Sequence, residues 1–180
     1  MQYFSILLPN FLKSSDILNN ISNYAIPIHL FQILLFMCYY AGIELGSGDK
    51  MLEVYIDAAS AGNPGPSAIG IFIKGEGQQV KISEAIGITN NHIAEFTALI
   101  RGLQEAAKLS NGIISVRSDS KIVVTSIEKK FVKNEEYKPY LTQALKLMEQ
   151  FELFFIKWIP DSQNKAADAL AREGIQKNKK

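Results

Sequence analysis

Four acidic side chains of this sequence stand at positions where acids are uncommon. Asp57 ends an alternating apolar and polar segment, and Asp119 closes another apolar segment. Glu95 lies beside the apolar stripe of a predicted helix, and Asp168 lies among alanines in the segment AADALA. Taken singly, each has an ordinary explanation as a turn former, a helix N-cap, an ion-pair partner or a solvent-facing charge. The four become informative together if the fold gathers them at one place.

The elements that must position these acids follow from the periodicity of the apolar residues. Residues 52–60 alternate between two faces as a strand does, whereas residues 91–109 repeat with the spacing of a helix. The other predicted strands cover 68–74, 79–87, 112–119 and 151–158, and the other predicted helices cover 121–130, 136–150 and 164–174. Short turns between the first three strands predict an antiparallel meander, and the later alternation of helices and strands predicts parallel pairing. The predicted fold class is therefore α/β: a five-stranded mixed sheet, a three-strand antiparallel meander plus parallel strands, with helices on both faces.

In such a sheet the first and fourth strands can be neighbours, which would bring Asp57 and Asp119 together at their carboxyl ends. Glu95, near the start of the first helix, can join them. Two carboxylates about 4 Å apart repel by about 4 kcal/mol at an effective dielectric of about 20, so such a cluster is expected to hold divalent cations. Oxygen ligands without His or Cys favour Mg²⁺ or Mn²⁺. Two such ions about 4 Å apart can activate a water and stabilise the leaving oxygen of a phosphodiester.

The composition excludes several classes of protein and divides the chain in two. A formal net charge of +1 over 180 residues excludes a strongly basic nucleic-acid coat and an acidic disordered chain. The single cysteine, Cys38, excludes an intrachain disulfide framework and a multi-cysteine zinc site, and it fits a reducing cytoplasmic location. Residues 1–50 hold only five charged side chains. We therefore predict an apolar extension over 1–50, a domain over 51–175 and a basic tail over 176–180.

Three interpretations of the apolar extension stay open. Residues 25–43 carry no formal charge and approach the length of a membrane span, although Pro27 and His29 make the segment a marginal one. The favoured interpretation is a misassigned start, because Met51 stands just before the first clear strand. A membrane anchor over 25–43 carries less weight, and a soluble extension carries the least.

Four segments of the chain resemble the signature blocks of type 1 ribonuclease H, in the order and with the spacing of that family. They read YIDAASAGNPGP, TNNHIAEFTALIRGL, VRSDSKIVV and NKAADALAREG, within about residues 51–175. The resemblance implies a ribonuclease H fold and an endonuclease that hydrolyses the RNA strand of RNA–DNA hybrids and leaves 5′-phosphomonoester products. It also implies two Mg²⁺ or Mn²⁺ ions per site and an RNA–DNA hybrid as partner. No protein partner is implied, and we expect a monomer.

Block by block, the resemblance also assigns roles to particular residues. The catalytic, metal-binding carboxylates would be Asp57, Glu95, Asp119 and Asp168, with Glu95 near the substrate 2′-hydroxyl, the group that distinguishes RNA from DNA. The substrate-binding residues would be Asn63, Thr89, Asn90, Asn91 and Asn164.

Two features depart from the pattern of the family. Trp158 stands where relatives with a short loop often have a histidine that assists protonation and product release, and we expect Trp158 to be a core aromatic. The long Trp- and Lys-rich insertion that some members use as a substrate handle is missing. Lys129, Lys130 and Lys133 form either a modest phosphate-binding patch or a solvated face. The alternative function is therefore a catalytically weak or inactive nucleic-acid-binding protein with the ribonuclease H fold.

Overall fold

The computed structural model describes residues 51–75 and 77–177, which belong to one compact unit that begins at Met51. The interpretations of residues 1–50, including the membrane segment at 25–43, lie outside the described residues, as does the end of the basic tail. No helix within the described ranges is long and apolar enough to cross a membrane.

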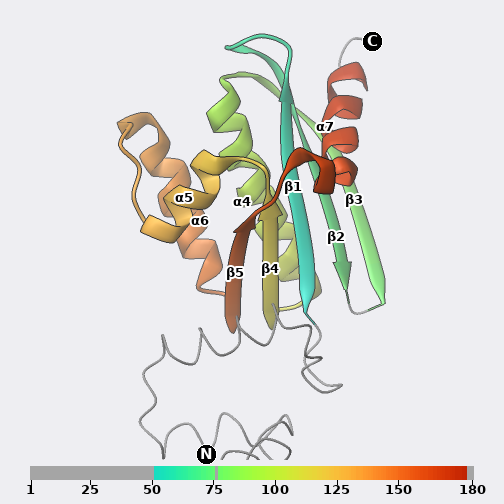
Figure 1. Ribbon diagram of the computed structural model, residues 1–180, viewed down its shortest axis with the longest axis vertical. Helices are drawn as coiled ribbons and strands as arrows, with labels where there is room; N and C mark the ends of the chain where they lie inside the picture. Colours follow the sequence, from blue (N-terminus) through green and yellow to red (C-terminus); the bar gives the residue numbers. More distant parts are fainter. Residues whose placement is uncertain (1–50, 76, 178–180) are drawn as a thin grey trace, which may run out of the picture. The chain divides into compact units, whose positions relative to one another are not determined.

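Five strands form a mixed sheet in the order β3-β2-β1-β4-β5 (Figure 1). β2 is antiparallel to both β1 and β3, whereas β4 is parallel to both β1 and β5. The predicted five-stranded mixed sheet, with its antiparallel meander and its parallel strands, is confirmed. The strands are β1 (Leu52–Ser60), β2 (Gly65–Gly75), β3 (Gln78–Thr89), β4 (Ile113–Ser118) and β5 (Leu153–Trp158).

Helices cover both faces of the sheet, as predicted (Figure 1). A Cβ added to Gly102 of α4 would meet Ile56 of β1, whereas a Cβ added to Gly70 of β2 would meet the backbone of α7 at Ala167. Because Gly70 pairs with Asp57, and adjacent residues of a strand point to opposite faces, α4 and α7 lie on opposite sides of the sheet. The helices are α4 (Asn91–Leu109), α5 (Lys121–Lys129), α6 (Lys138–Met148) and α7 (Lys165–Lys177), with 3₁₀ turns η1 (Glu135–Tyr137) and η2 (Asp161–Gln163).

The hydrophobic core lies on the α4 side of the sheet. Leu52, Val54 and Ile56 of β1 are at most 1% exposed, as their alternation in the sequence predicts. They belong to one cluster with Phe96 and Leu99 of α4, which are fully buried. Each buried side chain of this size contributes roughly 1.5 to 3 kcal/mol to folding. This packing fixes β1 and α4, the elements that carry the first two predicted acids.

Element boundaries differ from the prediction where capping groups interrupt the local pattern. The helix predicted over 136–150 is divided into η1 and α6. The Asn134 side chain caps the 3₁₀ turn by accepting a hydrogen bond from the amide of Glu136, and Pro139 lies in the first turn of α6. The last helix begins at Lys165, one residue later than predicted, because the preceding residue closes η2.

Candidate active site

Asp57 and Asp119 lie at the same level of two adjacent strands. β1 and β4 are parallel and pair Ile56 with Ser118, so the next residue of each strand reaches the same edge of the sheet. Asp57 lies within β1 and is 6% exposed, and Asp119 directly follows β4. The predicted pairing of the first and fourth strands is confirmed, and it places these two acids side by side.

Glu95 and Asp168 approach the same region from helices on opposite faces. Glu95 lies in the second turn of α4, and Asp168 lies in the first turn of α7. Burial, and then the charges of Asp57 and Asp119, raises the pKa of Glu95 well above its ordinary value. The charges of Asp119 and Asp168 likewise act on Asp57. The fold therefore brings the four predicted acids, the carboxylate cluster, within electrostatic range of one another.

The charged form of this carboxylate cluster is disfavoured in the folded protein. Burial, and then the charge of Asp119, raises the pKa of Asp57 from 3.8 to about 7. Burial also raises the pKa of Asp119, although hydrogen bonds, including one from Asn164, oppose that rise. A carboxyl group with a raised pKa gains most from a nearby positive charge. The electrostatics of the cluster therefore favour binding of a cation.

Sequence reasoning missed a fifth acid near the cluster, Asp161. This residue begins η2 and is exposed, and its charge adds to the raised pKa of both Asp57 and Asp119. In the sequence it is one acid in the connection before the last helix, and its place follows from the path of that connection across the ends of the strands.

Asn164, predicted as a substrate contact, has a fully buried side chain, and its contact with substrate stays a prediction. The Nδ2 atom donates hydrogen bonds to the carbonyl oxygen of Ile56, at 2.9 Å, and to Oδ1 of Asp119, at 3.1 Å. Asn164 thus ties β1, at the residue before Asp57, to the acid that follows β4, and it positions the carboxylate cluster.

The donor atoms of the site fit a hard divalent cation. Oε2 of Glu95 and Oδ1 of Asn164 are buried, and each lacks a hydrogen-bond partner within the described part of the chain. Oxygen donors of this kind are the ligands of Mg²⁺ and Mn²⁺. No three His, Cys, Asp or Glu side chains of residues 51–75 and 77–177 stand close enough together to hold a metal ion. A cation would therefore have to draw the carboxylates inward from the positions seen here.

The predicted contacts at the start of α4 form one linked group. Oδ1 of Asn63 accepts a hydrogen bond from the amide of Asn91, at 3.1 Å, and both residues are exposed. The side chain of Asn90 caps α4 by accepting from the amide of Ile93, at 2.8 Å. Thr89 ends β3 and is half-buried. Asn63 and Asn91 are thus accessible to a ligand, whereas the oxygen of Asn90 is occupied by the helix.

Trp158 is not the core aromatic that the sequence predicted. Its side chain is 42% exposed because it ends β5 at the same edge of the sheet as the acids. The indole Nε1 donates a hydrogen bond to the carbonyl oxygen of Asp119, at 2.9 Å. The amine of Lys121 lies 5.3 Å from the centre of the indole ring. Trp158 therefore holds the backbone of one carboxylate and also positions a lysine.

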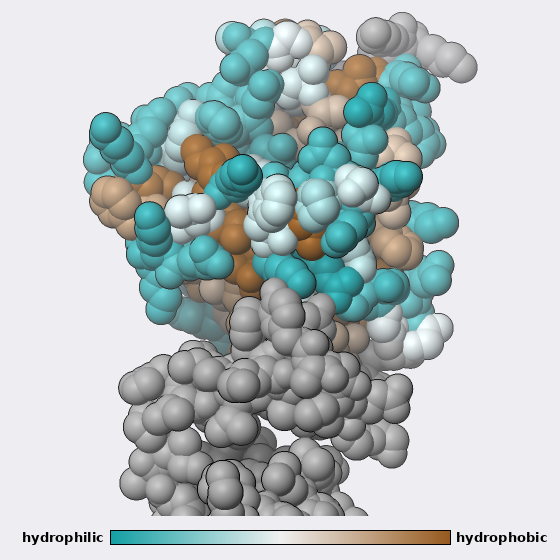
Figure 2. Space-filling model, viewed as in Figure 1, coloured by the Kyte–Doolittle hydropathy of each residue, from teal (hydrophilic) through white to brown (hydrophobic). Residues whose placement is uncertain are grey.

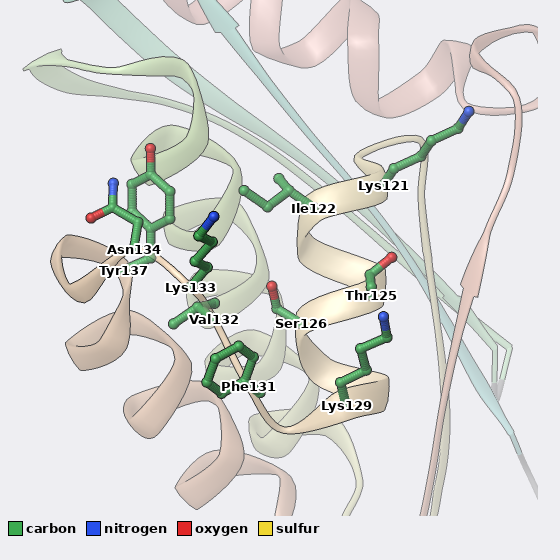
Figure 3. A pocket seen from close by; sticks show the side chains of 10 residues that line it. All are labelled: Lys121, Ile122, Thr125, Ser126, Lys129, Phe131, Val132, Lys133, Asn134 and Tyr137. Atoms are coloured by element: carbon green, nitrogen blue, oxygen red, sulfur yellow. The ribbon is translucent and has the colours of Figure 1, made fainter.

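A hollow of about 490 Å³, the α5 groove, lies between α5 and the connection to α6 (Figure 3). Two of the three predicted phosphate-patch lysines, Lys129 and Lys133, line it together with Lys121, whereas Lys130 does not. Phe131 at its rim is 61% exposed. The full lining is Lys121, Ile122, Thr125, Ser126, Lys129, Phe131, Val132, Lys133, Asn134 and Tyr137. Lys121, one of the lining residues, lies against the ring of Trp158. This end of the groove is therefore next to the carboxylate cluster.

The strand order, the two covering helices and the adjacent acids in β1 and after β4 together define a protein of the ribonuclease H fold. The family model described as "Reverse transcriptase-like" matches residues 56–174. The chain belongs to the type 1 ribonuclease H family.

Individual relatives agree with this assignment over the described domain. The putative hydrolase EbsB of Enterococcus faecalis is 46% identical over 129 residues, which are 71% of this chain and 96% of that protein. The crystal structure of LC11-RNase H1 in complex with RNA/DNA hybrid superposes with a TM-score of 0.67 and 31% identity, covering 72% of this chain and 99% of that one. The bifunctional protein Rv2228c of Mycobacterium tuberculosis is 34% identical over 123 residues, which are 66% of this chain and only 34% of that protein.

Proposed function

We propose that the protein is a metal-dependent endonuclease that hydrolyses the RNA strand of RNA–DNA hybrids. The observation that carries the proposal is the placement of Asp57 and Asp119 by the pairing of Ile56 with Ser118, with Glu95 and Asp168 added by α4 and α7. Carboxylates that repel one another in this way stay charged only beside a positive charge. A divalent cation would supply that charge and would also bind the phosphodiester. The RNA/DNA hybrid bound to a relative of 31% identity supports the choice of substrate.

The residues of the site have distinct roles in this proposal. Asp57, Glu95, Asp119 and Asp168 would hold two Mg²⁺ or Mn²⁺ ions. Such ions supply activation of a water and stabilisation of the leaving oxygen. Asn164 and Trp158 hold the carboxylate and the backbone of Asp119, respectively, so that this acid keeps its place as charges change. The unpartnered Oε2 of Glu95 leaves that residue an acceptor for the 2′-hydroxyl of the RNA strand.

Contacts with the nucleic-acid backbone would come from two sides of the carboxylate cluster. The exposed Asn63 and Asn91, with Thr89 and Asn90 beside them, lie at the N-terminus of α4, where the positive end of the helix dipole favours phosphate. The lysines of the α5 groove offer a second contact to phosphates. On the face seen in Figure 2, hydrophilic residues predominate, which suits a polyanion better than an apolar partner. We also propose a monomeric protein and, because a chain with a single cysteine fits a reducing compartment, a cytoplasmic location.

Cleavage of a labelled RNA–DNA hybrid by the full chain tests this function. In Mg²⁺ or Mn²⁺ the wild type should cut the RNA strand, and a chelator should stop it. Asp119→Asn should reduce the rate about a hundredfold or more, since even the partners of metal ligands are worth about 10- to 100-fold. Glu149→Gln, at the exposed C-cap position of α6, is the matched control and should cut normally. Folded wild-type protein that cuts no hybrid in either metal would refute the proposal.

The second candidate is a catalytically weak or inactive member of the family that only binds nucleic acid. It is favoured by Trp158, whose ring has no ionisable proton and whose N–H is already engaged with the Asp119 carbonyl. Binding of the hybrid without cleavage in either metal would select this candidate. Slow cleavage by the wild type, faster in Trp158→His, would instead show that the protein is an enzyme. It would also show that the wild type lacks a proton donor at this position.

A further inference from the structure

A second hollow, of about 480 Å³, lies between the end of β1 and α7, and no sequence prediction assigned a role to it. This α7 groove begins at Ala58, the residue after Asp57, and one member of the carboxylate cluster, Asp168, lines it. Its lining is Ala58, Ala59, Ser60, Ala61, Asp168, Arg172, Ile175 and Gln176. The groove therefore adjoins the carboxylate cluster, where a phosphodiester would be cut.

Arg172 is the cation of this groove, and the N–H groups of its two terminal nitrogens remain available. Its Nε donates to Oδ1 of Asp168, four residues earlier on α7, at 2.6 Å. The two terminal nitrogens of Arg172 have no hydrogen-bond partner among residues 51–75 and 77–177, and the side chain is 71% exposed. An arginine fixed through Nε presents the planar pair of terminal nitrogens, which matches two oxygens of a phosphate.

We propose that the α7 groove binds a phosphate of the RNA strand and that Arg172, held by Asp168, is the residue that contacts it. This inference rests on the proposed nuclease function and adds a binding site to it. The RNA strand is the occupant because it is the strand that is cut, and the groove contains Asp168 and begins at the residue after Asp57. A phosphate next to the one that is cut would then reach the terminal nitrogens of Arg172.

The same helix contains a pair that shows what a purely structural role would look like. Lys177 and Glu173 are also four residues apart and form an exposed ion pair at 2.7 Å. Lys177 does not line the α7 groove, whereas Arg172 does. Such pairs contribute little to helix stability, so removal of either cation should leave the fold intact. Lys177→Ala is therefore the matched control for Arg172→Ala.

The first test measures affinity of the full chain for a short RNA–DNA hybrid by fluorescence anisotropy, with a chelator present so that nothing is cut. Arg172→Ala should weaken binding about five- to tenfold and reduce the slope of log affinity against log salt by about 1, as expected for one lost phosphate contact. Arg172→Lys should restore the salt slope but only part of the affinity, because a lysine has no fork of donors. Lys177→Ala should bind within about twofold of the wild type.

The second test locates the phosphate. Each hybrid carries a single 2′-deoxynucleotide whose phosphate is replaced by an uncharged methylphosphonate, and the series moves this change along the strand. The reference hybrid has the same 2′-deoxynucleotide with an ordinary phosphate. The wild type should lose affinity at particular positions of the RNA strand, and at one of them Arg172→Ala should lose nothing more. In the same scan of the DNA strand, the loss of binding free energy from Arg172→Ala and the loss from the methylphosphonate should add at every position.

Each outcome supports or overturns the inference. Wild-type affinity and salt slope in Arg172→Ala, or coupling of Arg172 to a DNA-strand phosphate, would overturn it while leaving the nuclease proposal intact. Failure of the wild type to bind any hybrid would overturn the proposed function itself. Coupling to one RNA-strand position, with Lys177→Ala unaffected, would establish the site.

Discussion

α4 and α7 cover opposite faces of the same sheet but are attached to it in different ways. α4 buries eight of its 19 residues, and among them are large side chains such as Phe96, Leu99 and Leu103. α7 buries only Ala167, Ala171 and Gly174. Large side chains on one side build the core, whereas small residues on the other side let the backbone of α7 lie close to β2. The first contact supplies stability, and the second sets the distance of Asp168 from Asp57.

The strongest way to sharpen this comparison is to remove charge from the α7 side. Because the pKa of Asp57 is raised from 3.8 to about 7, the folded protein holds a proton there that the unfolded chain has lost. The contribution to stability is thus complete below pH 3.8 and lost as the pH rises to about 7. In chelator, Asp57→Asn should be more stable than the wild type by about 2 to 4 kcal/mol near neutral pH and by little in acid.

Urea unfolding across this pH range measures the effect. Glu149→Gln, which removes an exposed acid, should follow the wild type at every pH. Added Mg²⁺ should reduce the gap between Asp57→Asn and the wild type, because the cation replaces the missing counter-charge. If the unfolding free energies of Asp57→Asn and the wild type changed in parallel with pH, the charge of Asp57 would not destabilise the folded protein.

A smaller effect separates the two attachments directly. A Cβ at Gly70 would lie 2.0 Å from the carbonyl oxygen of Ala167, which is backbone and cannot turn away. A Cβ at Gly102 would lie 2.9 Å from Cγ2 of Ile56, the end of a side chain. Gly70→Ala should therefore destabilise the fold by about 1 to 3 kcal/mol and slow cleavage by displacing α7.

Gly102→Ala is the control on the α4 side. Its strain is opposed by a gain in helix propensity of up to about 1 kcal/mol, so its unfolding free energy and its cleavage rate should stay near those of the wild type. Equal losses in Gly70→Ala and Gly102→Ala would contradict the idea that the α7 contact is the closer and less adaptable one.

The smallest predicted effect concerns Trp158, which lies outside both helices. Trp158→Phe keeps an aromatic ring but removes the hydrogen bond to the carbonyl of Asp119. The loss should cost about 0.5 to 1.5 kcal/mol in stability and lower the cleavage rate a few-fold, with a higher Mg²⁺ concentration at half-saturation. An unchanged metal requirement in Trp158→Phe would show that this bond does not position the acid.

Much of the fold was predictable because the signals are local. The alternation in β1 and the apolar stripe of α4 depend only on neighbouring residues, and both elements have the predicted bounds. The division of the predicted helix into η1 and α6 was missed, because the side-chain cap at Asn134 outweighs the apolar repeat. The four acids were found because they follow strands or enter apolar helix faces.

The roles of Asn164, Trp158 and Arg172 were not predictable in the same way. Each depends on which atoms face it across the ends of the strands. Asn164 has a polar side chain of the kind usually found at the surface, but it is buried between β1 and the carboxylate of Asp119. Trp158 has a large aromatic side chain of the kind usually found in a core, but its place at the end of β5 leaves it partly exposed. The spacing of Asp168 and Arg172 was a visible signal, but only the groove beside them gives it a use.

The sequence by itself determined the kinds of atom at the site and the strands and helices that carry them, because side-chain chemistry and short-range periodicity are properties of the chain. Only the tertiary structure decided that these atoms meet. Parallel pairing of β1 and β4 places Asp57 beside Asp119, and the close approach of α7 at Gly70 brings Asp168 and Arg172 to the same edge. Burial there raises the pKa of Asp57 to about 7. That shift comes from the removal of water and the nearness of other charges, which depend on the packing of segments distant in the sequence.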